Sequence, residues 1–477
     1  MQAAIILIFI SYFLTGFQLT SFAGYGVTLL DLALLLFYAT FFKKLLWDGE
    51  KITFSITPPL VFVLIMFAVV LLSGITPLIE GRSDWILQYL KTSLHFYFVA
   101  GFAVIVAVYP IEMKTWANVI RMWLVFALII NIFGLYQILA RAADLPLAWI
   151  EFTNVSLARG EGEITAENFR QLSLRYGNFY RATSIFSEPS ALGAFNSYIL
   201  AFLLIPIVFK YKPFINKKFF IITTLIFVSI GTFFTFSLTA ILGAMMVIGS
   251  FLFMQRIQHI FRFLLISLTI IIVIIGADSL FSKNIGISVV ELFSKRIEGI
   301  LNVGKGEDKF VIGESFNIRR ASAEKAVEIW QAYPILGIGA GLTYKNKIND
   351  LDFSDFTVFA VLAEYGIIGL MAFLTFFFSL VMISYRLARQ KTGDYDMTDE
   401  EKALMRVPFF IMIVLFLINF ISGNNFVLIN NWGPVAIVMS VINFTYVKEK
   451  RNLVTIRLVK NPLKDLFVRA VLAEKRK

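Results

Sequence analysis

A succession of apolar runs is the feature that most constrains how this chain can fold. Each run is long enough to cross about 30 Å of hydrocarbon as a helix. Hydrophobic residues make up 58% of the chain and charged residues only 16%, against about 25% charged residues in a soluble domain. We therefore predict an all-α, polytopic integral membrane protein with about twelve transmembrane helices and a partly helical extracytoplasmic loop. The predicted spans are residues 2–18, 25–42, 59–78, 93–110, 117–140, 190–209, 219–236, 238–255, 260–277, 356–385, 406–422 and 432–447.

The distribution of basic residues predicts the orientation of these helices. If the N-terminus is cytoplasmic, every even-numbered helix ends in the cytoplasm, where short loops are rich in Lys and Arg. We therefore expect both termini in the cytoplasm, and we attribute the net charge of +11 to membrane topology rather than to nucleic-acid binding. The residues that meet the rule are Lys43, Lys44, Lys114, Lys210, Lys212, Lys217, Lys218, Arg256, Arg262, Arg386, Arg389 and Lys391.

The same orientation divides the chain into parts with different surroundings. The first run lacks a basic start and a small-residue cleavage site, so we expect it to be a retained span. The basic tail alternates apolar and cationic residues, which favours a surface helix that anchors on anionic lipid. The predicted parts are membrane helices at 1–140, 190–277 and 356–447, long extracytoplasmic loops at 141–189 and 278–355, and a cytoplasmic tail at 448–477.

Residues 181–193, R-A-T-S-I-F-S-E-P-S-A-L-G, stand between the first long loop and an apolar span. Ser187 is a good N-cap residue, with Glu188 and Pro189 in the first turn, so a helix is expected to begin here. The N-terminus of a helix attracts anions, and Arg181 lies a few residues upstream. This chemistry suits a phosphate or pyrophosphate at the membrane surface. The alternative is that Glu188 only complements the helix dipole and Arg181 only meets lipid headgroups.

The second long loop contains an amphipathic pattern from residue 315 that ends at Pro334. Arg319 is predicted on the apolar side, where a buried arginine needs an anionic partner. Arg320 is predicted on the polar side, paired with Glu324. After Pro334 the chain reads I-L-G-I-G-A-G, whose glycines allow tight backbone geometry or close approach of a ligand. The predicted apolar stripe is Ala323, Ala326, Val327, Trp330 and Tyr333.

Acidic residues near the outer face are further candidates. Asp355 stands at the mouth of the tenth span, and Glu364 lies about two and a half turns deeper, where an ionisable residue is either functional or paired with a neighbouring helix. Asp31 in the second span has the same status and receives no role. Asp350 and Asp352 form a D-x-D, for which a solvated acidic turn is preferred to a metal–nucleotide-sugar site.

Cofactor chemistry has little support in the sequence. The chain has no cysteine, which removes thiolate ligands and nucleophiles. Its two histidines lie far apart in sequence and form no zinc motif. We therefore expect neither a metal nor another cofactor.

R-A-T-S-I-F-S-E-P-S-A-L-G, the later arginine followed by W-Q-A-Y-P-I-L-G-I-G-A-G, and E-Y-G-I-I-G together resemble the O-antigen polymerase and O-antigen ligase superfamily of polysaccharide-assembly membrane proteins. The resemblance covers roughly residues 175 to 370. The number and arrangement of spans agree with that family, although the first half of the chain supports it only through topology.

The resemblance implies a metal-independent glycosyltransferase of the bacterial cytoplasmic (inner) membrane that acts on the outer face. Its donor would be a glycan on undecaprenyl pyrophosphate, and its acceptor would carry a hydroxyl group. Arg181 and Arg319 would hold the pyrophosphate, with Arg320 as the alternative to Arg319. Asp355 or Glu188 would be the catalytic base. Lipid-linked donor and acceptor, membrane lipids, a chain-length regulator and a flippase would be the partners, and nucleic acid would not.

Two positions depart from the family pattern. Asp355 stands where the ligases usually have histidine, and Leu238 follows Ser237 where the family often has arginine. The first departure favours a polymerase, which transfers the growing glycan to a new lipid-linked repeat unit, over a ligase, which transfers it to a lipid A core or a protein. A lipid-linked oligosaccharide flippase is the alternative from another class. A transporter should show an internal repeat or paired interrupted helices, and no clear repeat is visible.

Overall fold

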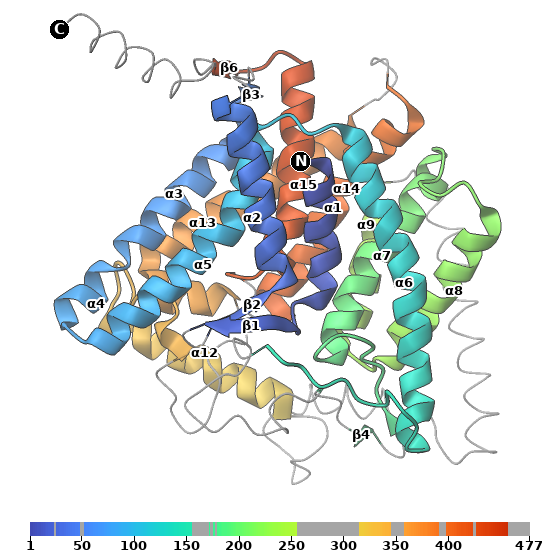
Figure 1. Ribbon diagram of the computed structural model, residues 1–477, viewed down its shortest axis with the longest axis horizontal. Coiled ribbons are helices and arrows are strands. Elements are labelled where there is room, and N and C mark those ends of the chain that lie inside the picture. Colours follow the sequence, from blue (N-terminus) through green and yellow to red (C-terminus); the bar gives the residue numbers. More distant parts are fainter. Residues whose placement is uncertain are drawn as a thin grey trace, which may run out of the picture.

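The computed structural model describes residues 1–22, 25–47, 52–154, 171, 175–176, 179–254, 314–344, 357–390, 397–422 and 426–456. The predicted span at 260–277 and most of the basic tail lie outside this part. Within it the protein is an all-α bundle (Figure 1). Its helices are α1 (Gln2–Ser11), α2 (Leu29–Phe42), α3 (Pro58–Leu72), α4 (Ile75–Glu80), α5 (Ser83–Val108), α6 (Met113–Ala142), α7 (Pro189–Phe209), α8 (Lys218–Phe234), α9 (Leu238–Met254), α12 (Glu314–Ala332), α13 (Thr357–Arg389), α14 (Asp399–Leu417) and α15 (Ile429–Lys448).

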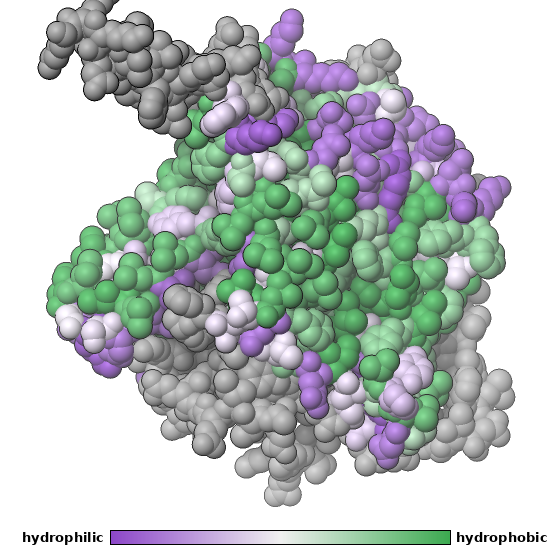
Figure 2. Space-filling view, in the orientation of Figure 1, coloured by the Kyte–Doolittle hydropathy of each residue, from purple (hydrophilic) through white to green (hydrophobic). Residues whose placement is uncertain are grey.

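Six helices of the described part are long and apolar enough to cross a membrane. Exposed apolar side chains form a broad hydrophobic surface across the middle of the bundle, whereas hydrophilic residues gather toward its ends (Figure 2). Both observations indicate an integral multi-pass membrane protein, while the total of twelve spans stays a prediction. The six spans are Pro58–Glu80, Ser83–Val108, Met113–Ala142, Pro189–Phe209, Thr357–Arg389 and Asp399–Phe420.

The first two helices are shorter than predicted. Helix α1 ends at Ser11, and α2 begins only at Leu29, because a two-stranded hairpin of β1 (Gln18–Phe22) and β2 (Tyr25–Thr28) occupies the residues between them. Thr28 caps α2, since the Asp31 carboxylate accepts hydrogen bonds at 2.7 Å from both the backbone N–H and the hydroxyl of Thr28. Such a cap provides hydrogen-bond acceptors for backbone N–H groups that have no partner within the helix at its N-terminus. Asp31 therefore has a structural explanation.

Helix α14 lies at the centre of the bundle and connects its two sides. It contacts α13 and α15 on one side and α7 and α9 on the other, while α5 packs against α15 and α13 against α3. Trp432, Trp116 and Trp123 are fully buried among phenylalanines in this core. Helices from early and late parts of the sequence thus pack against one another in the core.

The two ends of the bundle differ in structure (Figure 1). At the upper end, β3 (Ile52–Ser55) pairs with β6 (Leu453–Ile456) in an antiparallel ladder that joins the loop after α2 to the segment after α15. At the lower end, α12 lies across the bundle, and the two-residue strands β4 (Arg175–Tyr176) and β5 (Phe179–Tyr180) precede α7. Irregular backbone therefore gathers mainly at the lower end of the described chain.

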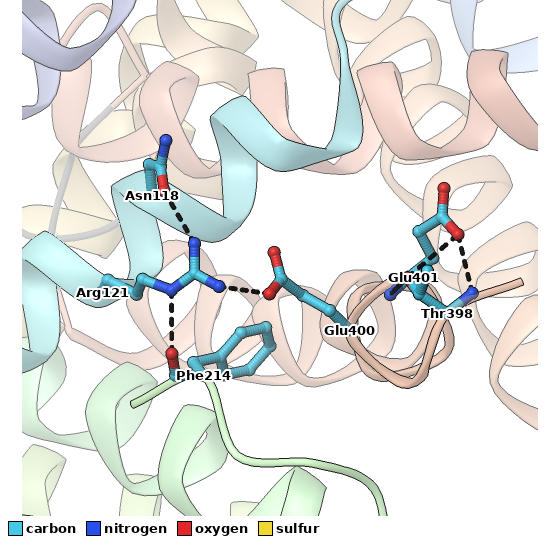
Figure 3. Close-up of polar contacts among 6 residues, drawn as sticks. All are labelled: Asn118, Arg121, Phe214, Thr398, Glu400 and Glu401. Carbon is cyan, nitrogen blue, oxygen red and sulfur yellow. Dashed lines mark hydrogen bonds and ion pairs between the residues drawn. The ribbon is translucent and has the colours of Figure 1, made fainter. Parts of the chain in front are cut away.

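An ion pair fastens the upper end (Figure 3). Arg121 of α6 pairs with Glu400 in the first turn of α14, and its Nε donates to the carbonyl of Phe214 in the loop after α7 at 2.8 Å. Thr398 caps α14, and its backbone N–H donates to Glu401 at 2.9 Å. Because both members of the pair are about one-third exposed, its contribution to stability is about 0–1 kcal/mol. Arg121 thereby links α6, the start of α14 and the loop after α7.

Helix α13 bends where a glycine breaks its backbone geometry. Gly366 has φ of +65° and ψ of −165°, which is a conformation open to glycine and unfavourable for other residues. A Cβ atom at this position would lie 2.2 Å from the carbonyl oxygen of Ile335. The bend therefore allows the chain between α12 and α13 to pack directly on the α13 backbone.

We predict that Gly366→Ala lowers the free energy of unfolding by about 1–3 kcal/mol, because it strains the backbone and forces Ile335 away. Thermal unfolding of the purified protein in lipid nanodiscs measures this as a fall in Tm. Gly249→Ala is the matched control, since a Cβ there has nothing within 4 Å. Its Tm should be unchanged or slightly higher, and equal losses in both variants would contradict the interpretation.

Candidate functional site

Residues 181–188, here called the Arg181 loop, connect β5 to α7 at the lower end of the bundle (Figure 1). Arg181 is half-buried, whereas Ala182, Thr183 and Ser184 are fully buried. The predicted anion-binding residue is therefore only partly covered, and the three residues that follow it lie inside the protein.

Hydrogen bonds to three other segments hold the Arg181 loop. The backbone N–H of Ala182 donates to the carbonyl of Phe234 at 2.9 Å, which joins the loop to the last residue of α8. The hydroxyl of Ser184 donates to the carbonyl of Ile130 in α6 at 2.6 Å. Gln171 donates to the carbonyls of Ser184 at 2.5 Å and Phe186 at 2.9 Å. An irregular buried backbone thus has partners for its polar groups.

Arg141, in the last turn of α6, lies beneath this loop and is 4% exposed. Its Nη1 donates to the carbonyl of Arg181 at 2.7 Å, and its Nη2 donates to the hydroxyl of Thr183 at 2.6 Å. Nη2 also donates to Gln171 at 2.8 Å, and Nε donates to the carbonyl of Ala148 at 2.8 Å. Sequence reasoning missed this residue. The available signal was an arginine at the outer end of a predicted span, against the positive-inside rule.

The start of α7 is one residue later than predicted. The N-cap is Glu188 rather than Ser187, and its side chain makes no capping hydrogen bond. Pro189 explains the shift, because proline favours the first helical position and holds the preceding residue in an extended conformation. Glu188 has φ of −146° and ψ of 158°, and both Ser187 and Glu188 are exposed.

The glycines after α12 adopt the geometry that only glycine takes easily. Gly337, Gly339 and Gly341 have φ of +72°, +113° and +72°. The backbone N–H groups of Ile338 and Gly339 donate to the carbonyls of Ala363 and Glu364 in α13, at 2.9 and 3.0 Å. Residues 334–341, here called the glycine turn, are therefore bound to the α13 backbone, as the expectation of tight backbone geometry requires.

Glu364 lies inside this arrangement and is 3% exposed. Its Oε1 accepts a hydrogen bond of 2.5 Å from the hydroxyl of Thr343. A buried polar side chain with such a partner stabilises the geometry around it. This environment explains Glu364 as a structural link between the glycine turn and α13.

Helix α12 forms as predicted, but its buried stripe is rotated. Ser322, Ala326 and Ile329 are buried, whereas Val327 and Trp330 are half-buried. The stripe packs on Trp85 of α5 and on Ala363 of α13, so small and β-branched side chains, rather than tryptophan, fit the close contact. The predicted stripe of Ala323, Ala326, Val327, Trp330 and Tyr333 is therefore correct only in part.

The end of α12 also contacts α4. The hydroxyl of Tyr333 donates to Glu80 at 3.1 Å, and the hydroxyl of Thr76 donates to the carbonyl of Gly337 at 2.7 Å. Burial, and then the carboxylate of Glu80, raise the pKa of Tyr333 above its usual value. The phenol therefore stays protonated as a donor at neutral pH.

The other predicted site residues are placed only in part. Arg319 and Arg320 belong to α12, but their side chains lie outside the described part, as does the whole of Asp355. The Arg181 loop and α12 occupy the same end of the bundle (Figure 1). Convergence of the arginine side chains stays a prediction, as does the role of Asp355. Asp350 and Asp352 also lie outside the described residues.

A scan against models of known protein families finds no match, and a search of curated proteins finds no relative.

We predict that Glu364→Gln retains most of the stability of the protein, because an amide oxygen still accepts from Thr343. Glu364→Leu should lose about 1–3 kcal/mol of unfolding free energy, since the buried hydroxyl of Thr343 then has no acceptor. Thermal unfolding in nanodiscs distinguishes the two. If Glu364→Leu keeps the wild-type Tm, the structural interpretation is wrong.

Proposed function

We propose that this protein is a membrane glycosyltransferase of the O-antigen polymerase type. It would transfer a growing glycan from undecaprenyl pyrophosphate to a lipid-linked repeat unit at the outer face of the bacterial cytoplasmic membrane. The proposal rests on the sequence motifs described above. The observation that carries it furthest is the rigid, buried support of the Arg181 loop at the end of the bundle that also carries α12.

A fixed arginine suits the chemistry of a pyrophosphate leaving group. The acceptor hydroxyl oxygen forms a bond to C1 of the donor sugar as the bond from C1 to the phosphate oxygen breaks, and one such displacement inverts C1. Negative charge then develops on the pyrophosphate, where positioned cations stabilise the transition state by several kcal/mol, about 2.7–4 for one good donor. Arg181 and Arg319, or Arg320 in place of the latter, are proposed for this role.

A carboxylate accepts the proton of the acceptor hydroxyl in this scheme. Asp355 is the first candidate, because it is predicted at the outer mouth of α13. Glu188 is the second, since it is exposed at the start of α7 as the last residue of the Arg181 loop. No metal is needed, because the arginines neutralise the leaving group.

The packing at the upper end supports the proposed topology. The β3–β6 ladder joins the loop after α2 to the segment after α15 on one side of the bundle. We propose that this side is cytoplasmic, with both termini, and that the lower end faces outward. The lower end then presents the Arg181 loop and α12 to the lipid-linked substrate.

Incubation of the purified protein with lipid-pyrophosphate-linked repeat units in EDTA tests the proposal. We expect a ladder of products from the wild type and a loss of about 100-fold or more in rate for Arg181→Ala and for Arg319→Ala. Arg82→Ala is the control, because Arg82 is an exposed arginine at the start of α5 that contacts Asp84. It should keep the ladder.

Chemical rescue sharpens this experiment, because the wild-type chain has no cysteine. Arg181→Cys should be inactive and should regain activity when a guanidinium-bearing methanethiosulfonate restores the cation. An uncharged reagent of similar size should restore nothing. Activity that survives Arg181→Ala and Arg319→Ala would exclude the pyrophosphate clamp, and a single transfer to a lipid A core or protein without a ladder would indicate the ligase.

A further inference from the structure

We infer that Arg141 is a positioning residue for the pyrophosphate site: it holds the chain at Arg181 and directly after it, so that the Arg181 side chain meets the lipid-linked diphosphate. The inference rests on the proposed function, and it adds a residue to which the sequence motifs give no role. Arg141 acts through Arg181 rather than through contact with the substrate.

The geometry of the guanidinium group supports this role. The Nη1 bond of 2.7 Å goes to the carbonyl of Arg181 itself, and the Nη2 bond of 2.6 Å goes to the side chain two residues later, at Thr183. Nη2 also binds Gln171, which in turn donates to the carbonyls of Ser184 and Phe186. One planar group therefore fixes four of the six residues from Arg181 to Phe186, directly or through Gln171, and its fork geometry is unique to arginine.

Aromatic contacts also restrain Tyr180, the residue that precedes Arg181. The guanidinium carbon of Arg141 lies 4.2 Å from the centre of the Trp149 ring, within the range of a cation–π contact. Trp149 meets the ring of Tyr180 edge-on at 5.1 Å. Tyr180 directly precedes Arg181, so the same side chain restrains the loop from its N-terminal side.

A second buried arginine shows what purely structural support looks like. Arg406 is 7% exposed near the upper end, where Nη2 donates at 3.0 Å to the carbonyl of Gln390, directly after α13. That bond satisfies a carbonyl at the end of a helix. The hydrogen bonds of Arg141 instead go mainly to irregular segments around the half-buried Arg181. The charge of Arg141 also makes the surroundings of Arg181 more positive, which favours an anion there.

Arg141→Lys tests the inference, because lysine keeps the charge but cannot donate in three directions from a planar fork. We expect the apparent KM for the lipid-pyrophosphate donor to rise about tenfold or more, from the loss of at least two charge-assisted hydrogen bonds. Arg406→Lys is the matched control, with an equally buried arginine at the other end. It should leave the donor KM within about twofold of wild type.

A cysteine reporter gives a readout that needs no activity. Ala182 is fully buried, and the chain has no other cysteine, so Ala182→Cys should react slowly with a membrane-impermeant maleimide. Adding Arg141→Lys should speed labelling about tenfold or more, whereas adding Arg406→Lys should not. If the protein proves not to polymerise glycans, this result still decides whether Arg141 holds the loop.

Coupling between the two arginines completes the test. If Arg141 acts through Arg181, then Arg141→Lys should cause little further loss of activity in an Arg181→Ala background. Three outcomes would overturn the inference: labelling unchanged by Arg141→Lys, faster labelling with an unchanged donor KM, or losses that multiply in the double variant.

Discussion

Inside a bilayer, every backbone N–H and C=O group must find a partner within the protein, and this requirement explains the distribution of structure in this chain. Regular helices meet it through the middle of the bundle. Irregular backbone is found at the ends, where buried polar side chains supply the missing partners. The Arg181 loop depends on this compensation most, because three consecutive residues are fully buried without helical or sheet hydrogen bonds.

The two irregular regions at the lower end meet the requirement with different side chains. Arg141 donates to the carbonyl of Arg181 and to the hydroxyl of Thr183, whereas Glu364 accepts from the hydroxyl of Thr343 beside the glycine turn. The glycines are needed because their positive φ angles bring backbone directly against α13. A buried arginine and a buried glutamate thus each shape one of the two segments in which the sequence motifs lie.

Hydropathy predicted an all-α protein with apolar helices long enough to cross a bilayer, and six such helices are present in the described part, because length and apolar content decide whether a segment can span. It could not predict where α2 begins, since the Thr28–Asp31 cap and the β1–β2 hairpin are local polar features within an apolar run. The stripe of α12 was predicted from the helical spacing of apolar residues, but Ser322 and Ile329 are buried instead, which that spacing did not indicate.

The sequence points to the candidate site only through short motifs such as the one around Arg181. The motif around Arg181 identified the loop, yet its support comes from Arg141, 40 residues earlier in the chain. Such pairings between distant polar residues leave no periodic pattern in a single sequence. The start of α7 was misjudged by one residue because Pro189 outweighed the capping preference of Ser187.

The packing of early helices against late ones has a consequence for biosynthesis. Helices α3 and α5 rest on α13 and α15, and Asn443 in α15 accepts from the backbone of Ser55, 388 residues earlier. During translation α3 and α5 therefore keep part of their final contact surface uncovered until α13 and α15 leave the ribosome. Assembly is then a late, cooperative event, and loss of α15 would leave α5 without its partner.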